Sequence, residues 1–354
     1  MEHPQRIPGL DAWRGLGVFF LFNLLFFGNF TAEMQAWAAG AGLLEKIAGR
    51  VADLLFSSGV LGFDMLFMVS GVLIFRKASC DDTRPLSLPT GLYARLLPFL
   101  AVAGIPFLAY RAISPADYFR SLLLLEPMNV PSPFLRALEQ ANAFLLFYAL
   151  AALWLLLARR ARISHAWGWA VGAVTMAAFS LQELRWLPVN GHFLSFFWGI
   201  GVAWVAQRWK GCRRLPGWAG AALLIAAALW CRKLSAARGA DLYFLMDGHD
   251  WASLASALQV QSILAAALAC SLTPGGFWQA AAPCRVLGRA SNCFFMVMLL
   301  WSFTLTRAYA DLFANQIASA AFLYAVTLGM TLALAFLLAP FLEKAPFVRI
   351  SAVR

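Results

Sequence analysis

The feature that most constrains this chain is a series of ten apolar runs, each long enough to cross a bilayer as a helix. Crossing about 30 Å of hydrocarbon takes about 20 mostly apolar residues, because each helical residue advances the chain by about 1.5 Å. The runs occupy residues 12–30, 54–75, 93–112, 141–158, 166–182, 190–207, 216–232, 251–272, 290–308 and 317–341. The sequence therefore predicts an all-α, polytopic membrane helix bundle of about ten transmembrane helices.

The composition excludes the soluble alternatives. Hydrophobic residues make up 62% of the 354 positions and charged residues 13%, whereas soluble domains carry about 45–50% apolar and about 25% charged residues. A disordered chain, a coiled coil or a soluble α/β enzyme does not tolerate so much apolar surface. No tandem repeat is evident, so we expect a single transmembrane domain over residues 1–354 with no separate soluble domain.

The charge distribution predicts the orientation. Most of the 28 lysines and arginines that give the net charge of +11 fall at the termini and in the loops after even-numbered runs. The positive-inside rule then places both termini in the cytoplasm. Basic loops beside anionic lipid explain this charge without nucleic acid, which we do not expect as a partner. The six cysteines show no CxxC spacing, so neither a metal site nor a disulfide framework is indicated. The first helix is expected to act as an uncleaved insertion signal.

Two charged residues open the first apolar run. Asp11 and Arg14 are three positions apart, so on a helix they share a face and can form an ion pair. Such a pair is either an interfacial anchor or a cationic group held by a carboxylate at the cytoplasmic mouth. The second alternative suits a donor that carries phosphates, because a guanidinium binds two oxygens at once.

Two further residues are candidates on the outer side of the predicted bundle. Asp64 lies in the second run and is expected to face the bundle interior with a hydrogen-bonding or basic partner on another helix, since a lone carboxylate in hydrocarbon costs several kcal/mol. His192 begins the sixth run and is the histidine best placed to act as a base, although a structural role is the alternative. The amphipathic stretches at 36–47 and 118–125 are expected to lie along the outer interface or to cap a cavity.

Several motifs carry a family resemblance. Residues 7–16 match an opening with Leu-Asp followed by Arg-Gly, and residues 62–74 follow the signature Gly-Val-Asp-Leu-Phe-Phe-Val-Leu-Ser-Gly-Phe-Leu-Ile almost position by position. Shorter matches follow in the same order at 93–98, 148–150, 287–291 and 342–347. In these motifs the chain resembles the acyltransferase 3 family of bacterial integral membrane acyltransferases, whose members usually have ten spans.

The resemblance implies transfer of an acetyl or other short acyl group to a hydroxyl of a cell-envelope polysaccharide, glycan or lipid. The donor would be cytoplasmic acyl-CoA, such as acetyl-CoA, no metal is expected, and the location would be the bacterial inner membrane. Arg14, Asp11 and Arg95 are the candidates for binding the donor. His192 and Asp64 are the candidates for catalysis, because the attacking hydroxyl needs a base.

The chain departs from the family at its histidines. The histidine expected eleven residues after Arg14 is replaced by Leu25, and those expected in the late helix and the fourth helix are replaced by Met298 and Ala143. Asn23 cannot substitute, since a shift of two residues turns a helix position by about 200°. Three hypotheses therefore stay open: an acyltransferase whose base is His192, Asp64 or the substrate; a silent relative that binds an envelope precursor or assists a glycan-synthesis partner; and a transporter of acyl groups or lipid-linked sugars.

Overall fold

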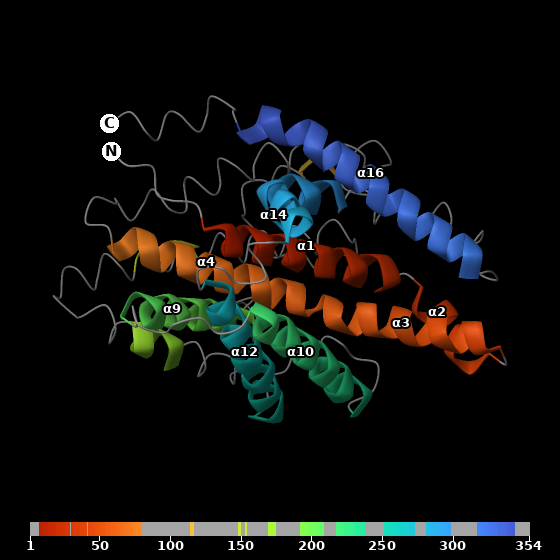
Figure 1. Ribbon diagram of the computed structural model, residues 1–354, viewed down its shortest axis with the longest axis horizontal. Coiled ribbons are helices and arrows are strands. Elements are labelled where there is room, and N and C mark those ends of the chain that lie inside the picture. The colour runs from red at the N-terminus through yellow and green to blue at the C-terminus, as the bar shows by residue number, and fades with distance from the viewer. Residues whose placement is uncertain are drawn as a thin grey trace. The chain divides into compact units, whose positions relative to one another are not determined.

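The computed structural model describes residues 7–28, 30–40, 42–79, 114–116, 148–149, 153, 169–174, 192–208, 217–237, 251–272, 281–298 and 317–343. Within these ranges every regular element is an α-helix and no β-strand occurs (Figure 1). Among the described residues, four helical stretches are long and apolar enough to cross a membrane: Pro8–Gly28, Leu43–Arg76, Leu254–Leu272 and Ser319–Pro340. The prediction of an all-α chain with helices of membrane-spanning length is thereby confirmed, and the count of ten spans stays a prediction.

Six of the predicted runs coincide with described helices: 12–30, 54–75, 190–207, 216–232, 251–272 and 317–341. The other four, at 93–112, 141–158, 166–182 and 290–308, lie wholly or partly outside the described residues, as does the amphipathic stretch at 118–125.

The chain forms two compact units. Unit 1 comprises Met1–Cys80, Ala166–Leu184 and Val189–Ser291, and unit 2 comprises Asp81–His165, Arg185–Pro188 and Asn292–Arg354. In unit 2 the longest described helix is α16 (Ile317–Glu343), whose exposed Phe322, Val326 and Met330 recur every four residues. This apolar stripe suits contact with lipid chains. The expected single transmembrane domain stays a prediction.

In unit 1, α1 (Pro8–Gly28) packs antiparallel against the joined helices α3 (Leu43–Gly59) and α4 (Leu61–Ser79). Glycines let these backbones meet. A Cβ atom on Gly59 would lie 2.5 Å from the Cβ of Leu24, and a Cβ atom on Gly62 would overlap a carbonyl oxygen of α1. Apolar helices gain little from the hydrophobic effect within a bilayer, so such close backbone contact supplies the packing that holds them together.

The second apolar run differs from the single span predicted over 54–75. The helix already begins at Leu43 and is interrupted at Val60. Just before the interruption, the hydroxyl groups of Ser57 and Ser58 each donate to a carbonyl oxygen three residues earlier, at 3.2 Å. This type of bond bends helices. The bend is small, because α3 and α4 follow nearly one line in Figure 1 and give one apolar run of 34 residues.

The amphipathic stretch at 36–47 comprises the end of one helix, a turn and the start of the next helix. α2 (Thr31–Ala39) ends before Gly40, which has an extended ψ of 156°, and α3 starts after Gly42, with a ψ of 144°. The backbone N–H of Gly42 donates to the carboxylate of Glu45 at 3.2 Å, which caps the new helix. The two glycines therefore turn the chain back on itself.

Two further helices, α10 (Gly217–Ala237) and α12 (Trp251–Leu272), pack against each other in unit 1. A short helix, α14 (Ala282–Arg289), occupies the segment expected as a basic loop. α14 runs antiparallel to the first turns of α1, where a Cβ atom on Gly288 would overlap the carbonyl oxygen of Asp11. The late motif and the opening motif are thus in direct contact.

Candidate functional site

A buried polar cluster surrounds Asp64 on α4. The hydroxyl of Ser195, from α9 (His192–Arg208), donates to Oδ1 of Asp64, and Nε2 of Gln261, from α12, donates to the same oxygen at 3.1 Å. All three side chains are at most 1% exposed. The prediction that Asp64 faces the interior with a hydrogen-bonding partner on another helix is confirmed, with two helices contributing.

The cluster is positioned by glycine contacts between α4 and α9. A Cβ atom on Gly71 would overlap the carbonyl oxygen of Phe196, and one on Gly199 would overlap that of Met68. The two helices therefore run parallel with their backbones touching, as expected for two even-numbered spans. This register brings Ser195 to the level of Asp64, so the hydrogen bond depends on small residues at neighbouring turns.

Asp64 lies halfway along the apolar part of α3 and α4. It is 11 residues from Asp53 and 12 residues from the exposed Arg76, which gives about 17 Å to either charged residue at about 1.5 Å per residue. In a bilayer with about 30 Å of hydrocarbon, this position is close to the midplane. The sequence pattern suggests the outer third of the run instead, and the depth of Asp64 stays a prediction.

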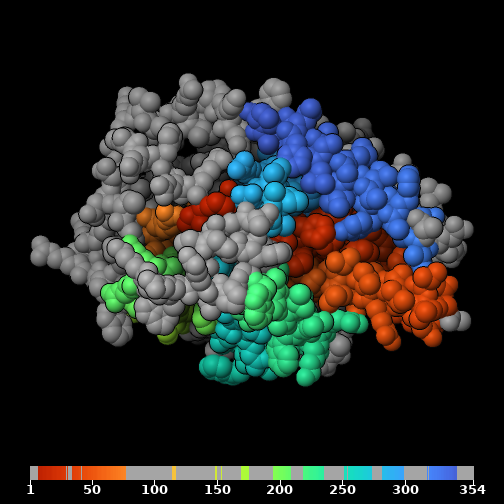
Figure 2. All heavy atoms as spheres, viewed as in Figure 1, coloured from red at the N-terminus to blue at the C-terminus, as the bar shows by residue number. Residues whose placement is uncertain are grey.

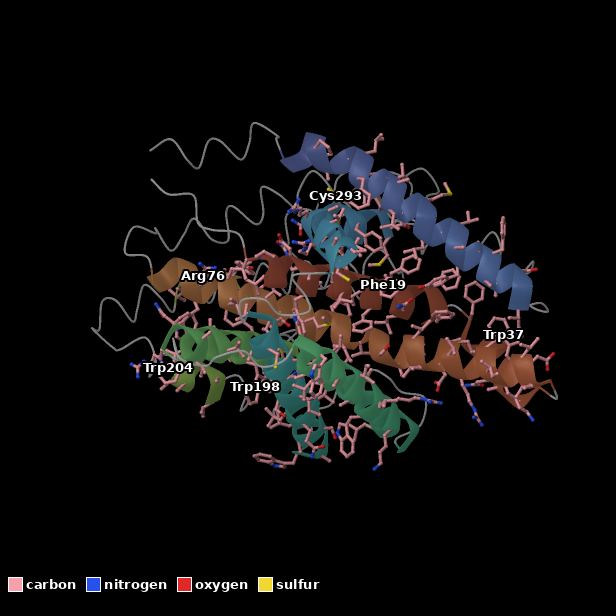
Figure 3. All side chains as sticks on the ribbon, viewed as in Figure 1. Phe19, Trp37, Arg76, Trp198, Trp204 and Cys293 are labelled. Carbon is pink, nitrogen blue, oxygen red and sulfur yellow. The ribbon has the colours of Figure 1, made fainter. Side chains whose placement is uncertain are left out.

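Tryptophans on α9 and α12 indicate a similar depth for the two partners of Asp64. Ser195 precedes Trp204 by nine residues, and the guanidinium of Arg208 lies 4.6 Å from the centre of that ring. Gln261 follows the exposed Trp251 by ten residues. Tryptophan is enriched at membrane interfaces, and both intervals correspond to about 13–15 Å of helix. Figure 3 shows Arg76 and Trp204 toward the same end of unit 1.

The opening motif lies on the first turns of α1. Asp11 and Arg14 are both half-buried and one turn apart on this helix, which is the spacing that the predicted pair needs. Gly15 and Gly17 fix their surroundings, because a Cβ atom on Gly15 would overlap the backbone of α14 and one on Gly17 would lie 3.3 Å from the carbonyl oxygen of Gly62. The candidate donor end is therefore built where α1 meets α14 and α4.

Two predicted site residues are described in part or not at all. His192 is the first residue of α9 and lies three residues before Ser195, which is close to one helical turn. Arg95 lies outside the described residues. Their proposed roles in catalysis and donor binding stay predictions.

The positions of the missing family histidines are filled by apolar residues. Leu25 is half-buried on α1, and Met298 is 2% exposed in unit 2. Ala143 lies outside the described residues. Neither a leucine nor a methionine can accept a proton, so these two side chains cannot supply the base that the resemblance implies.

Sequence reasoning missed the two partners of Asp64. Gln261 carried a usable signal, because an amide in the middle of an apolar run needs a partner on another helix. Ser195 gave almost no such signal, since a serine hydroxyl can donate to a carbonyl oxygen of its own helix. Ser70 does so, and its hydroxyl donates to the carbonyl oxygen of Leu66 at 3.0 Å.

The described residues include no cluster of three or more His, Cys, Asp or Glu side chains with metal-binding geometry. Four cysteines within these ranges form no disulfide: Cys231, Cys270, Cys284 and Cys293. Burial raises the pKa of the Cys284 thiol above its ordinary value, which disfavours the thiolate that a metal or an electrophile would need.

Comparison of the chain with protein-family models, with curated proteins and with solved structures found no match. The resemblance to the acyltransferase 3 family accordingly rests on the motifs alone, and both the family and the function that it implies are proposals.

Proposed function

We propose that the chain is a membrane O-acyltransferase of the acyltransferase 3 type, in a bacterial inner membrane with both termini in the cytoplasm. In the reaction, a hydroxyl oxygen of an envelope polysaccharide, glycan or lipid attacks the thioester carbon of acyl-CoA. The C–S bond breaks, an ester C–O bond forms, and the hydroxyl proton passes through a base to the departing coenzyme A thiolate.

The observation that carries the proposal is the assembly of the motifs in unit 1. The opening motif touches the late motif through Asp11 and Gly288, and Gly17, the residue that directly follows the opening motif, touches the long signature at Gly62. Motifs that are far apart in sequence thus form one packed body around the start of α1. Contact of this kind is what a shared site requires.

The proposal gives each candidate residue a role. Arg14, held by Asp11 and joined by Arg95, binds the donor phosphates, because a guanidinium binds phosphate oxygens through its fork. Asp64 or His192 takes the proton. The midplane position of Asp64 supports this role, since a donor entering from one side and an acceptor from the other would meet at that depth.

Thioester turnover tests the proposal. Purified protein in lipid nanodiscs would receive radiolabelled acetyl-CoA and envelope glycan fractions, and ester formation and free thiol would both be measured. Arg14→Ala should abolish donor binding, His192→Ala should abolish transfer while donor binding persists, and Arg208→Ala serves as a matched control cation on another helix. Turnover that survives Arg14→Ala would refute the assigned donor site. Absence of turnover with every acceptor would refute the proposal that the chain is an acyltransferase.

A second function is favoured by Leu25 and Met298. A chain that keeps the donor-side residues but has apolar side chains at two family histidine positions suits a silent relative, which binds an envelope precursor or assists a glycan-synthesis partner. Leu25→His restores the family residue on α1. Activity gained by this variant, in a protein that is otherwise inactive yet binds acyl-CoA, would support the silent relative over the active enzyme.

A further inference from the structure

The joined helices α3 and α4 form one run of 34 residues, which is about 51 Å of helix and longer than the about 40–45 Å thickness of a whole bilayer. Nε of Arg232 on α10 lies 2.8 Å from Oδ2 of Asp53 on α3, and these side chains are 38% and 50% exposed. Next to this ion pair, Nζ of Lys233 lies 4.9 Å from the centre of the Trp230 ring. A half-exposed ion pair beside a tryptophan and a lysine is typical of a membrane interface.

The helix α3 continues beyond that ion pair. Residues 43–52, which we call the α3 projection, add ten residues, or about 15 Å of helix. The headgroup layer on each side of the hydrocarbon is only about 5–8 Å thick. Figure 1 shows α3 and α4 following nearly one line. If Asp53 lies at the interface, a helix that continues in this direction carries its first turns beyond a headgroup layer of this thickness.

The α3 projection nevertheless exposes large apolar side chains. Leu43 and Leu44 are 75% and 79% exposed, and Ile47 and Val51 about half exposed. Positions 43, 47 and 51 are four residues apart and therefore form one stripe along the helix. An apolar stripe of this kind outside hydrocarbon is a mark of a binding surface.

The neighbouring helix does not cover this stripe. α2 packs on another side of the α3 projection, where a Cβ atom on Gly49 would lie 2.6 Å from the backbone nitrogen of Ala38. Figure 2 shows the atoms of α2 and α3 in orange at the surface, and Figure 3 shows Trp37 of α2 beside the start of α3. α2 thus packs on a side of the α3 projection that does not carry the apolar stripe.

The charges of the α3 projection are unbalanced. The carboxylate of Glu45 caps its own helix, and Asp53 is engaged by Arg232. Lys46 and Arg50 are exposed, one turn apart, and neither forms an ion pair with the residues that the structure describes. Both flank the apolar stripe at position 47, so the surface combines apolar contact with two positive charges.

We propose that the α3 projection docks a helix of another protein, on the Asp53 side of the membrane, that presents apolar side chains at i, i+4 and i+8 flanked by carboxylates. Such a partner buries the stripe by helix packing and pairs with Lys46 and Arg50. A second copy of this chain fits less well, because a symmetric pairing would bring four positive charges together. Lipid fits less well because Leu43, Leu44 and Ile47 lie above the hydrocarbon. The inference does not depend on acyl transfer.

Binding of two synthetic helical peptides tests the charge argument. Both peptides would carry leucine at i, i+4 and i+8, with flanking glutamates in one and flanking lysines in the other, and binding to the full chain in nanodiscs would be followed by fluorescence anisotropy. We expect the glutamate peptide to bind about five- to tenfold tighter, as two surface ion pairs allow. Lys46→Glu with Arg50→Glu should reverse the preference, and Arg76→Glu, at the far end of the same helical run, should leave it unchanged.

Three results would overturn the proposal. The first is equal binding, or no binding, of the two peptides. The second is quenching of a fluorophore on Ile47→Cys by a quencher attached to lipid acyl chains, which would assign the stripe to the membrane. The third is a dimer of the intact chain that Ile47→Glu dissociates, which would assign the stripe to a second copy.

Discussion

The hydrogen bonds to Asp64 give the sharpest test of how α4 packs against α9 and α12. Asp64→Leu removes the acceptor and leaves the Ser195 hydroxyl and the Gln261 amide, both at most 1% exposed, without it. Asp64→Asn keeps one carbonyl oxygen at nearly the same position. The two substitutions therefore separate loss of the acceptor from loss of the charge.

The expected magnitudes follow from the number of bonds. Asp64→Leu removes both hydrogen bonds and should lower the free energy of unfolding by about 1–3 kcal/mol, which is the sum of two bonds between membrane helices. Hydrogen bonds between membrane helices contribute about 0.6 kcal/mol on average and up to about 1.7 kcal/mol. Ser195→Ala should cost an amount in that range. Ser70→Ala is the matched control and should cost less than about 0.5 kcal/mol, since its hydroxyl bonds within its own helix.

Unfolding of the detergent-solubilised protein, followed by tryptophan fluorescence, measures these differences. A double-mutant cycle that combines Asp64→Leu with Ser195→Ala should give a coupling energy of about 0.6–1.7 kcal/mol. A coupling energy within about 0.3 kcal/mol of zero, or a Ser70→Ala variant as unstable as Ser195→Ala, would show that the hydrogen bond does not hold α4 to α9.

Three other outcomes are expected. Gly288→Ala should destabilise the fold by about 1–3 kcal/mol through overpacking. Gly201→Ala, where an added Cβ has no neighbour within 4 Å, should be neutral in the same unfolding assay. Equal effects of the two substitutions would contradict the close approach of α14 to α1. The ion pair of Asp53 and Arg232 is half-exposed, so Asp53→Asn should lower the free energy of unfolding by less than about 1 kcal/mol, and by less still in high salt. A loss of stability that does not depend on salt would exclude an ion pair screened by solvent. Because burial raises the pKa of Cys284, its thiolate forms at a higher pH than the thiolate of an ordinary cysteine. Maleimide labelling of Cys284, detected by mass spectrometry, should therefore rise at a higher pH than the labelling of glutathione. Labelling of Cys284 that rises in parallel with that of glutathione would contradict this.

The parts of the fold that the sequence predicted are those that the bilayer dictates locally. Apolar runs must be helical in hydrocarbon, because every backbone polar group has to be satisfied within its own segment. A carboxylate in such a run must face protein, which is why the burial of Asp64 was predictable. Its partners were not, since Ser195 and Gln261 are 131 and 197 residues away in the chain and only the packing of three helices brings them together.

The boundaries that the sequence misplaced lie where hydrocarbon no longer constrains the chain. α3 starts at Leu43 and not near 54, because Glu45, Lys46 and Arg50 lower the local hydropathy without opposing a helix. α14 was expected as a basic loop for the same reason. Its helix is supported by backbone contact with α1 at Gly288, which no local pattern reveals.

Packing alone explains much of the long signature. Gly62 and Gly71 lie where α4 touches α1 and α9, and Asp64 holds three helices together. A chain that only had to fold this way would need these residues, whatever reaction it performed, so their match to the acyltransferase 3 family bears on the fold more than on the chemistry. Chemistry has to be judged at positions where packing makes no such demand. Leu25 is half-buried on α1, at the position where the resemblance predicts a histidine. The effect of Leu25→His on turnover therefore distinguishes an enzyme with another base from a fold kept for binding.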